Sequence, residues 1–263
     1  MEVDQSQLET YNNVVEAISV PMKNFGTPEG RRKGGLASLI THNSKSTGFV
    51  VAKRIKRPKE SKTLAEFVGI MFGDGHMSKY QAMVTTNSVT DLEHGAYVAS
   101  LMQQLFGIKT RTSVKRSSRA IDVVASSRTL VDFLHSKGMP LGNKISHNLS
   151  VPRWILGNVQ YRKSFVRGLF DTDGSVYLDK HVVKGKLYRH LGCTITSYAD
   201  RLLSDIVNIL VAMDFRPTNR PTQKSVFIRR QSEIHRYFKE IGTSNPKHLE
   251  RYLRFIGRVP KRS

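Results

Sequence analysis

The sequence predicts an α+β protein made of two similar halves, and two observations lead to this prediction. One stretch occurs twice, as LAEFVGIMFGDG at 64–75 and as KSFVRGLFDTDG at 163–174, with a constant offset of 99 residues (173 − 74). The elements expected after each copy also follow one order, which makes each half helix, two strands, helix, two strands, helix. A unit that recurs in this way is typical of a duplicated fold. We therefore divide the chain into an extension at 1–62, a first repeat at 63–161 and a second repeat at 162–263.

Each copy of the stretch has the pattern of a short helix. In the first copy, Leu64, Phe67, Val68 and Met71 follow the i, i+3, i+4, i+7 spacing of an apolar helix face. Small residues also recur at every fourth position, which lets two helix backbones approach closely. They are Ala65, Gly69 and Gly73 in the first copy, and Ser164, Gly168 and Thr172 in the second. We therefore expect the two helices to pack against each other.

Both copies end in Asp-Gly, and this ending carries the chemistry. In two parallel helices, Asp74 and Asp173 would lie side by side at the C-terminal ends, where the helix dipole is negative. Two carboxylates there repel each other unless a cation lies between them, and a divalent metal with oxygen ligands is the natural choice. The glycines that follow, Gly75 and Gly174, suit the left-handed conformation that ends many helices.

The other elements follow from periodicity and from turn residues. In the first repeat we expect one or two strands at 76–88, a helix at 91–105 ending at Gly107, a strand pair at 109–115 and 120–125, and a helix at 128–137 closed by Gly138. In the second we expect strands at 176–178 and 188–197, a helix at 200–213, a strand pair at 216–220 and 225–229, and a helix at 233–240. The extension has modest helical periodicity at 8–20, followed by a basic stretch rich in Gly and Pro. It fits either a disordered basic tail or an arm that contacts DNA.

The two motif segments resemble the LAGLIDADG motif of the homing endonucleases. VGIMFGDG and RGLFDTDG match the motif around its central glycine and at the final Asp-Gly. The first copy has Phe72 where the family often has an acid, whereas the second keeps Asp171. The resemblance covers about 200 residues, from Ser61 to the C-terminus, and leaves out the first 60.

This resemblance implies a fold and an activity. Each repeat would contribute an antiparallel sheet to a DNA-binding saddle, with the motif helices packed at its centre. The chain would be an intron-encoded, monomeric homing endonuclease that cuts both strands of a long, asymmetric DNA site with Mg²⁺. Mn²⁺ would substitute, and Ca²⁺ would support binding without cleavage. The metal ligands would be Asp74 and Asp173, helped by the carbonyls of Gly73 and Thr172.

Four further residues are candidates for the same site. Lys144 and Lys247 lie 70 (144 − 74) and 74 (247 − 173) residues after the acid of their repeat, where the family keeps a basic residue near the scissile phosphate. A lysine there would offset developing charge, although a surface lysine is the ordinary alternative in a chain with 42 Lys and Arg. Asn87 and Ser197 end the inner strands, where the family often has a polar residue that positions water.

The charge of the chain indicates a polyanionic partner. Against 42 Lys and Arg there are 21 Asp and Glu, which gives a net charge of +21 and favours nucleic acid. A two-stranded ribbon fits the major groove, where arginine reads guanine, although a solvated sheet face would also look basic here. The candidate DNA-binding residues in the strand pairs are Arg111, Lys115, Arg116 and Arg119, and in the second repeat Arg220, Lys224, Arg229 and Arg230. Because the two sets differ, the half-sites should differ too.

Other functions stay open or are disfavoured. An intron RNA maturase and a non-catalytic DNA-binding regulator are the alternatives, and keeping both Asp74 and Asp173 argues against the regulator. An intein is not expected, because the chain starts with Met-Glu and ends with Lys-Arg-Ser. We expect no secretion signal and no membrane partner, and hence a cytoplasmic or organellar location. The single Cys193 excludes an internal disulfide and is expected to be buried in a strand.

Overall fold

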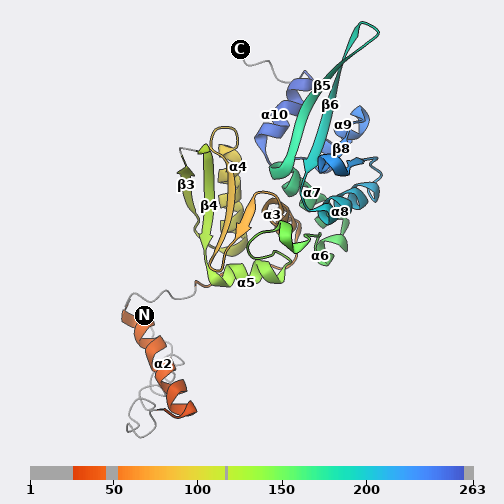
Figure 1. The fold of residues 1–263 in the computed structure, drawn as a ribbon. Coiled ribbons are helices and arrows are strands. Elements are labelled where there is room, and N and C mark those ends of the chain that lie inside the picture. The colour runs from red at the N-terminus through yellow and green to blue at the C-terminus, as the bar shows by residue number, and fades with distance from the viewer. Residues whose placement is uncertain (1–25, 46–52, 116–117, 258–263) are drawn as a thin grey trace. The chain divides into compact units, whose positions relative to one another are not determined.

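The computed structural model describes residues 26–45, 53–115 and 118–257 (Figure 1). The chain divides into two compact units between Ala52 and Lys53. In the first unit the described residues form one helix, α2 (Pro28–Lys45). The Thr27 hydroxyl accepts from the Gly30 N–H at 3.0 Å, and Lys33 pairs with Glu29 one turn away at 3.4 Å. The sequence analysis did not predict this helix, since two adjacent glycines lower helix propensity at its centre. The periodic segment at 8–20 lies outside the described residues.

The second unit holds both repeats. The first repeat consists of α3 (Lys62–Phe72), β1 (Gly75–Met77), β2 (Gln81–Asn87), α4 (Leu92–Phe106), β3 (Arg111–Lys115), β4 (Ala120–Ser126) and α5 (Arg128–Ser136). The second consists of α7 (Val159–Asp173), β5 (Gly174–Val183), β6 (Lys186–Thr196), α8 (Asp200–Val211), β7 (Thr218–Arg220), β8 (Ser225–Ile228) and α9 (Gln231–Glu240). A short helix α6 (Arg153–Leu156) precedes α7, and α10 (Pro246–Phe255) follows α9.

The two sheets have equivalent topologies. Both are antiparallel, with strand orders β1-β2-β4-β3 and β5-β6-β8-β7. Together with the element order, this confirms the predicted α+β fold with two αββαββα repeats. In each sheet one face packs on the helices and the other, which we call the open face, does not. No helix in the described part of the chain is long and apolar enough to cross a bilayer.

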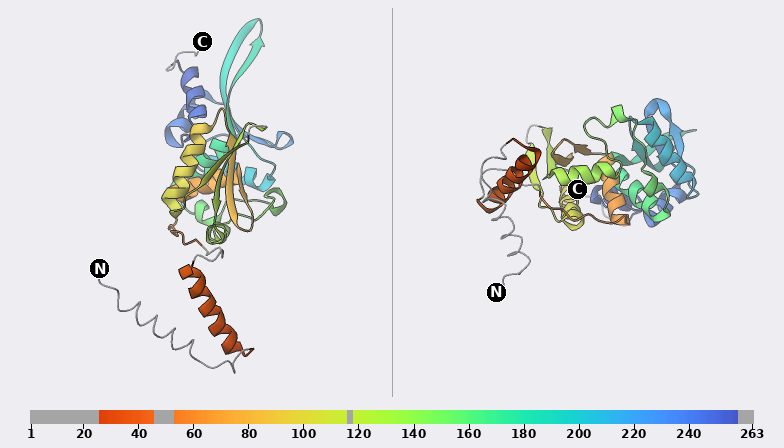
Figure 2. Two further views of the ribbon diagram at one scale, coloured as in Figure 1. Left: turned by 90° about the vertical axis from the view of Figure 1, so that its left-hand side faces the viewer. Right: turned by 90° about the horizontal axis from the view of Figure 1, so that it is seen from below.

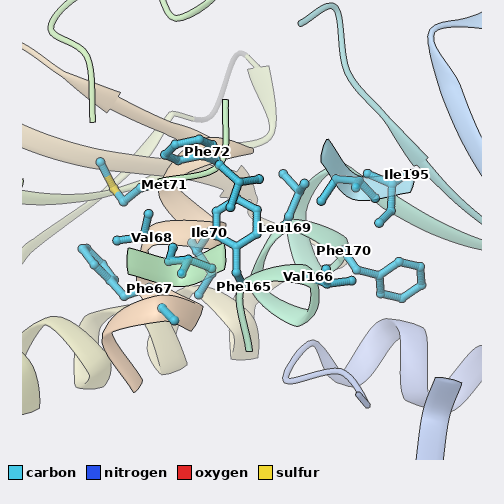
Figure 3. Packing of buried hydrophobic residues seen from close by; sticks show 14 of the residues in the cluster. Phe67, Val68, Ile70, Met71, Phe72, Phe165, Val166, Leu169, Phe170 and Ile195 are labelled. Carbon is cyan, nitrogen blue, oxygen red and sulfur yellow. The ribbon is translucent and has the colours of Figure 1, made fainter. Parts of the chain in front are cut away.

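The motif helices α3 and α7 pack tightly against each other in the core (Figure 3). A side chain at Gly69 would overlap the backbone carbonyl of Phe165, and one at Gly168 would overlap the carbonyl of Glu66. Apolar side chains seal the contact, for example Phe72, whose ring meets the Phe165 ring edge-on at 5.2 Å. The column of small residues therefore allows the close helix contact that the sequence predicted.

The glycines after the two aspartates act differently from the prediction. Gly75 and Gly174 are the first residues of β1 and β5, and neither has a positive φ. The expected left-handed helix ends are therefore wrong. Glycine is needed for space, because a side chain at Gly75 would overlap the Met71 backbone and one at Gly174 would overlap the carbonyl of Phe170. By contrast, Gly107 ends α4 with φ 67°, as expected.

The hairpin of β5 and β6 is much longer than predicted. Its pairing runs over ten residue pairs, from Gly174 with Ile195 to Val183 with Lys186, whereas β8 pairs only with Cys193–Thr196. The turn residues Lys184 and Gly185 have φ of 49° and 74°, which matches the twist of a two-residue hairpin. The end of the hairpin consequently projects beyond the rest of its sheet (Figures 1 and 2). The first repeat has no such extension, since β1 has three residues.

Candidate active site

The two motif aspartates come together at the C-terminal ends of α3 and α7. A methyl group placed on Gly73 would overlap the Thr172 side chain and lie 3.3 Å from the carboxyl carbon of Asp173. Burial raises the pKa of Asp74 to about 6 and that of Asp173 to about 7. The charge of Asp74 raises the pKa of Asp173 further, and Lys144 lowers both. The sequence therefore placed these two carboxylates correctly beside each other.

Lys144 lies directly on the end of the first motif helix. Its ammonium donates to the carbonyls of Met71 at 3.3 Å, Phe72 at 3.0 Å and Gly73. Cations are stabilised at this negative end of a helix. Burial lowers the pKa of Lys144, while the charges of Asp173 and Asp74 raise it. The lysine thus binds the Gly73 carbonyl, which the sequence analysis had assigned to a metal.

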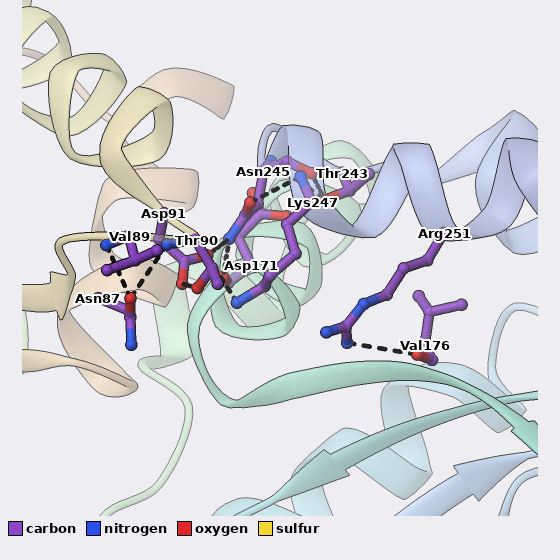
Figure 4. Close-up of polar contacts among 10 residues, drawn as sticks. All are labelled: Asn87, Val89, Thr90, Asp91, Asp171, Val176, Thr243, Asn245, Lys247 and Arg251. Carbon is purple, nitrogen blue, oxygen red and sulfur yellow. Dashed lines mark hydrogen bonds and ion pairs between the residues drawn. The ribbon is translucent and has the colours of Figure 1, made fainter. Parts of the chain in front are cut away.

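Lys247 is held in a different way, by an acid of the other repeat. Its ammonium pairs with Asp91 at 2.6 Å (Figure 4). Asn245, which is 1% exposed, donates to the same Asp91 oxygen at 2.7 Å and to the backbone carbonyl of Asp171 at 2.9 Å. Its own side-chain oxygen accepts from the Lys247 N–H and caps α10. One buried amide therefore joins the two repeats and fixes the start of the helix that carries Lys247.

Asp171 anchors the loop before that helix. Its carboxylate accepts from the Thr243 hydroxyl and from the Ser244 N–H, at 2.9 Å to the nearer oxygen. Burial raises the pKa of Asp171 to about 7, although these hydrogen bonds favour its charged form. Phe72 fills the corresponding place in the first copy, so this anchor exists only in the second repeat.

A surface pocket of about 290 Å³ opens beside Asp74. It brings together Thr172, Asn87, Arg119 and Lys247 from the predicted set, with Asp91 from the newly found network. Lys144 and Asp173 lie at the helix ends but do not line this pocket, and Ser197 lies elsewhere, before α8. The pocket has polar walls drawn from both repeats.

Asn87 and Ser197 have turn contacts in the free protein. The Asn87 side-chain oxygen accepts from the N–H groups of Val89 at 2.8 Å and Thr90 at 3.0 Å. The Ser197 hydroxyl accepts from the Ala199 N–H at 3.2 Å. These oxygens hold equivalent turns before α4 and α8, a role typical of Asn and Ser. Water positioning by either residue stays a prediction.

The predicted DNA-binding side chains are less confined to strands than expected. Arg111 and Lys115 lie in β3 and Arg220 in β7, while Arg119, Lys224, Arg229 and Arg230 lie in turns or just after a strand, and Arg116 lies outside the described residues. Three of them have acidic partners, because Lys115 pairs with Asp122 at 2.6 Å, Lys224 with Asp200 at 2.7 Å and Arg230 with Glu233 at 3.8 Å. To bind the DNA backbone, these three side chains would have to leave their acidic partners and pair with phosphates instead.

The oxygen atoms at the helix ends suit a hard divalent cation. The carboxylates of Asp74 and Asp173 and the carbonyls of Gly73 and Thr172 are the kind of ligand that Mg²⁺ prefers. Within residues 26–45, 53–115 and 118–257, no group of three or more His, Cys, Asp or Glu residues is placed to hold a metal. The site therefore fits an ion that completes its shell with water and substrate phosphate, as Mg²⁺ commonly does.

The sequence analysis missed the polar contacts that join the repeats. Asp91 and Asn245 are one such pair. Glu66 is another centre, since it lies in α3, is 3% exposed and accepts from Tyr97, Arg167 and Ser244. An Asn before Pro246 signals a helix cap, but its contact with Asp91 spans 154 residues and leaves no local pattern.

Comparison with protein families assigns the second repeat. Residues 160–242 match the model of the LAGLIDADG-like domain. The matched segment contains the second motif, which confirms the resemblance to the LAGLIDADG family.

Curated proteins match over part of their length. The replication factor C small subunit of Thermococcus kodakarensis is 27% identical over 206 residues, which is 75% of this chain and 21% of that protein. The tRNA-splicing ligase RtcB of Methanopyrus kandleri is 26% identical over 148 residues, which is 51% of this chain and 14% of that protein. The chain spans between 7% and 21% of the length of such relatives.

Solved structures are similar at low identity. I-DmoI in complex with DNA and Ca is 17% identical with a TM-score of 0.45, over 68% of this chain and 88% of that one. I-LtrWI, a LAGLIDADG homing endonuclease bound to target DNA, is 12% identical with a TM-score of 0.48, over 74% and 91%. Full-length DUF199/WhiA from Thermatoga maritima is 14% identical with a TM-score of 0.48, over 78% and 64%.

Proposed function

We propose that the protein is a divalent-metal-dependent endonuclease that cuts both strands of a specific DNA site. The observation that carries the proposal is the pair Asp74 and Asp173. Two carboxylates with raised pKa values lie together at the negative ends of two helices. This arrangement costs stability in the free protein, because each desolvated charge is disfavoured. A bound divalent cation would remove that cost and give the arrangement a purpose.

The residues of the site suit phosphodiester hydrolysis. Asp74, Asp173 and the carbonyls of Gly73 and Thr172 would hold Mg²⁺, with Mn²⁺ as a substitute and Ca²⁺ supporting binding alone. Such an ion activates water and stabilises the leaving oxygen. Lys144 and Lys247 carry positive charge to the helix ends, where they can stabilise charge that develops on a phosphate. Asp91 and Asn245 hold Lys247 in place.

The scaffold suits a long duplex site with two unlike halves. The open faces of the two sheets carry different basic side chains, and the LAGLIDADG-like domain supports a DNA-binding nuclease. Both motif helices come from one chain, so the packing between them is satisfied in a monomer. Encoding within an intron and a cytoplasmic or organellar location stay predictions.

A non-catalytic DNA-binding protein is the second candidate, and one contact favours it. The Lys144 ammonium already binds the Gly73 carbonyl and offsets the charge of both aspartates. A protein that never binds metal could keep the carboxylates in this way. A maturase for intron RNA, the other alternative, needs a surface for unpaired bases.

One experiment separates these functions. The full-length protein is incubated with a randomised duplex DNA library in Mg²⁺, and the new ends are sequenced; parallel reactions contain EDTA or the double variant Asp74→Asn/Asp173→Asn. An endonuclease produces one enriched sequence with breaks at fixed positions in both strands, and neither control does. Selection of a bound sequence in Ca²⁺ without any ends in Mg²⁺ would instead establish the non-catalytic binder.

A further inference from the structure

A row of aromatic rings covers the open face of the second sheet and its projecting hairpin. The imidazoles of His181 and His190 have centroids 5.2 Å apart, and the Tyr188 ring lies 5.7 Å from His181, with planes within 23° of parallel. Nearer the body of the sheet, the Tyr177 ring meets Phe227 edge-on at 6.5 Å. The five rings come from β5, β6 and β8, so the row crosses three strands.

The pairing register puts all five rings on one face. His181 pairs with Tyr188, Tyr177 with Gly192, and Phe227 with Thr194, and opposite residues in a sheet point to the same side. Val176 and Cys193, one position further along, point the other way and are buried against the helices. The rings consequently lie on the face of the sheet that points away from the core.

Gly192 makes room for the centre of this row. A side chain at this position would overlap the ring of Tyr177 across the strand pair. Glycine at this position therefore leaves room for the Tyr177 ring over β6.

The spacing of the row suits the stacking of unpaired bases on its rings. Four rings follow one another along β6 at every second residue. Tyr188 and His190 belong to β6 itself, the Tyr177 ring lies over Gly192, and the Phe227 ring lies beside Thr194. Steps of two residues are about 6.7 Å long, roughly twice the ~3.4 Å rise of a duplex strand. Stacked base pairs cannot follow such steps, whereas an extended single strand can place one base on each ring.

Positive charge lies at both ends of the row. The Lys186 ammonium lies 5.6 Å from the centre of the Tyr188 ring, and the Arg229 guanidinium lies 4.6 Å from the centre of the Phe227 ring. These cations can hold the phosphates of a strand whose bases lie on the rings. The acid on this face, Asp179, lies 3.9 Å from His181 and opposite His190, where it can accept a hydrogen bond from a hydroxyl.

The first sheet has nothing comparable. Among the described residues of its strands the one aromatic ring is the imidazole of His76. The centre of its open face is a polar cluster in which Asp122 accepts from Thr85 at 2.7 Å and pairs with Lys115. The row of rings is therefore a feature of one repeat and not of the shared fold.

We propose that the open face of the second sheet, from Phe227 to Tyr188, binds single-stranded RNA by stacking its unpaired bases. Aromatic side chains on a sheet are a common means of holding unpaired bases, and loops of RNA are where such bases are normally available. The ribose hydroxyl, which DNA lacks, gives Asp179 a donor to bind. The site lies apart from the carboxylate pair, so it does not depend on DNA cleavage, but it shares the open face of the second sheet with the duplex surface proposed above, and RNA and duplex DNA would compete for that face.

The test is a titration of the full-length protein with labelled oligonucleotides. The probes are a twelve-residue oligouridine, the matching oligothymidine, a base-free ribose-phosphate chain of equal length, and a short duplex. The variants Tyr177→Leu, Tyr188→Leu and Phe227→Leu each remove one ring. Tyr80→Leu is the matched control, since Tyr80 is an exposed tyrosine beside a lysine in the first repeat, outside the row. Thermal unfolding shows that each variant is folded.

Each ring variant should bind oligouridine roughly 5- to 150-fold more weakly, the range expected for loss of one base stack. The Tyr80→Leu variant and the base-free chain should show no such change, and oligothymidine should bind more weakly than oligouridine. Unchanged oligouridine binding, or equal losses for oligouridine and duplex, would overturn the stacking site. Oligothymidine binding as tight as oligouridine would overturn the assignment to RNA. The Asp173→Asn variant, which should lose cleavage, should bind oligouridine normally.

Discussion

The two repeats have the same backbone plan but differ in chemistry at both places where they could meet nucleic acid. At the motif ends, Lys144 lies on the carbonyls of its own repeat's helix, whereas Lys247 pairs with Asp91 of the other repeat. On the open faces, one sheet carries a polar cluster and the other a row of rings. Close packing of α3 on α7 therefore keeps the motif helices alike, whereas the side chains around them differ between the repeats.

The largest expected effect tests the part that the repeats share. Replacing Gly69 or Gly168 by Leu forces a side chain into the backbone of the facing motif helix. Each variant should lose more than about 3 kcal/mol of unfolding free energy, as severe overpacking does. Urea unfolding measures the loss.

The same measurement has an internal control. Gly34→Leu in α2 should cost nothing comparable, because no atom beyond its neighbours in the helix lies within 4 Å of the position that its side chain would enter. The losses of unfolding free energy in Gly69→Leu and Gly168→Leu should be similar. If they differed from each other by as much as either differs from the loss in Gly34→Leu, the two motif helices would not contribute equally to their contact, and the comparison of the repeats would be wrong.

A smaller effect tests the contact that joins the repeats. Asn245→Leu removes the cap of α10, one of the donors to Asp91 and the side-chain donor to the Asp171 carbonyl. We expect a loss of about 2 kcal/mol. Asn158→Leu, which removes a cap from α7 without any contact between repeats, should cost about 1 kcal/mol. Equal losses in urea unfolding would mean that Asn245 acts as an ordinary helix cap.

The aspartates predict an unusual dependence of stability on pH. The folded-state pKa of Asp173, about 7, lies above the value of about 4 in an unfolded chain. The folded protein then binds more protons, so this group's contribution to stability is complete below about pH 4 and is lost as pH rises through 7. Without metal at pH 8, Asp173→Asn should be between about 1 and 2 kcal/mol more stable than wild type, with no difference near pH 4.

A companion variant sharpens this test. Asp74→Asn should show a smaller gain that develops about one pH unit lower, because the pKa of Asp74 is about 6. If wild type and Asp173→Asn had the same unfolding free energy at every pH between 4 and 8, the paired carboxylates would not destabilise the metal-free protein.

The smallest effect compares the two lysines. Lys144→Met removes a cation from the Gly73 carbonyl and from both aspartates, so Ca²⁺ should bind about tenfold more tightly, which corresponds to about 1.4 kcal/mol. Lys247→Met should change Ca²⁺ affinity less, since Asp91 already offsets its charge. Calorimetric titration at pH 8 gives both affinities. A larger change in Lys247→Met would reverse the roles assigned to the two lysines.

Local patterns in the sequence predicted most of the fold and the centre of the site. The repeated small residues and the Asp-Gly endings were sufficient to predict α3, α7 and the adjacent carboxylates. Features that depend on distant partners were not predictable in this way. Asn245 bonds to residues 74 and 154 positions away, and the long hairpin depends on cross-strand pairs instead of on an apolar face. Gly75 and Gly174 were misread because crowding, which has no local signature, requires them to be glycine.

Cleavage by single aspartate variants tests the central claim most directly. A supercoiled plasmid carrying the site recovered from the library is incubated in Mg²⁺ with wild type, Asp74→Asn or Asp173→Asn, and the products are separated on a gel. We expect wild type to linearise the plasmid. Each variant should do so at least about 100-fold more slowly, because metal-based charge stabilisation is worth several kcal/mol. Binding in Ca²⁺ should persist, since it depends on the sheets. If either variant linearised the plasmid at the wild-type rate, that aspartate would not be a catalytic ligand, and the paired-carboxylate mechanism would be wrong.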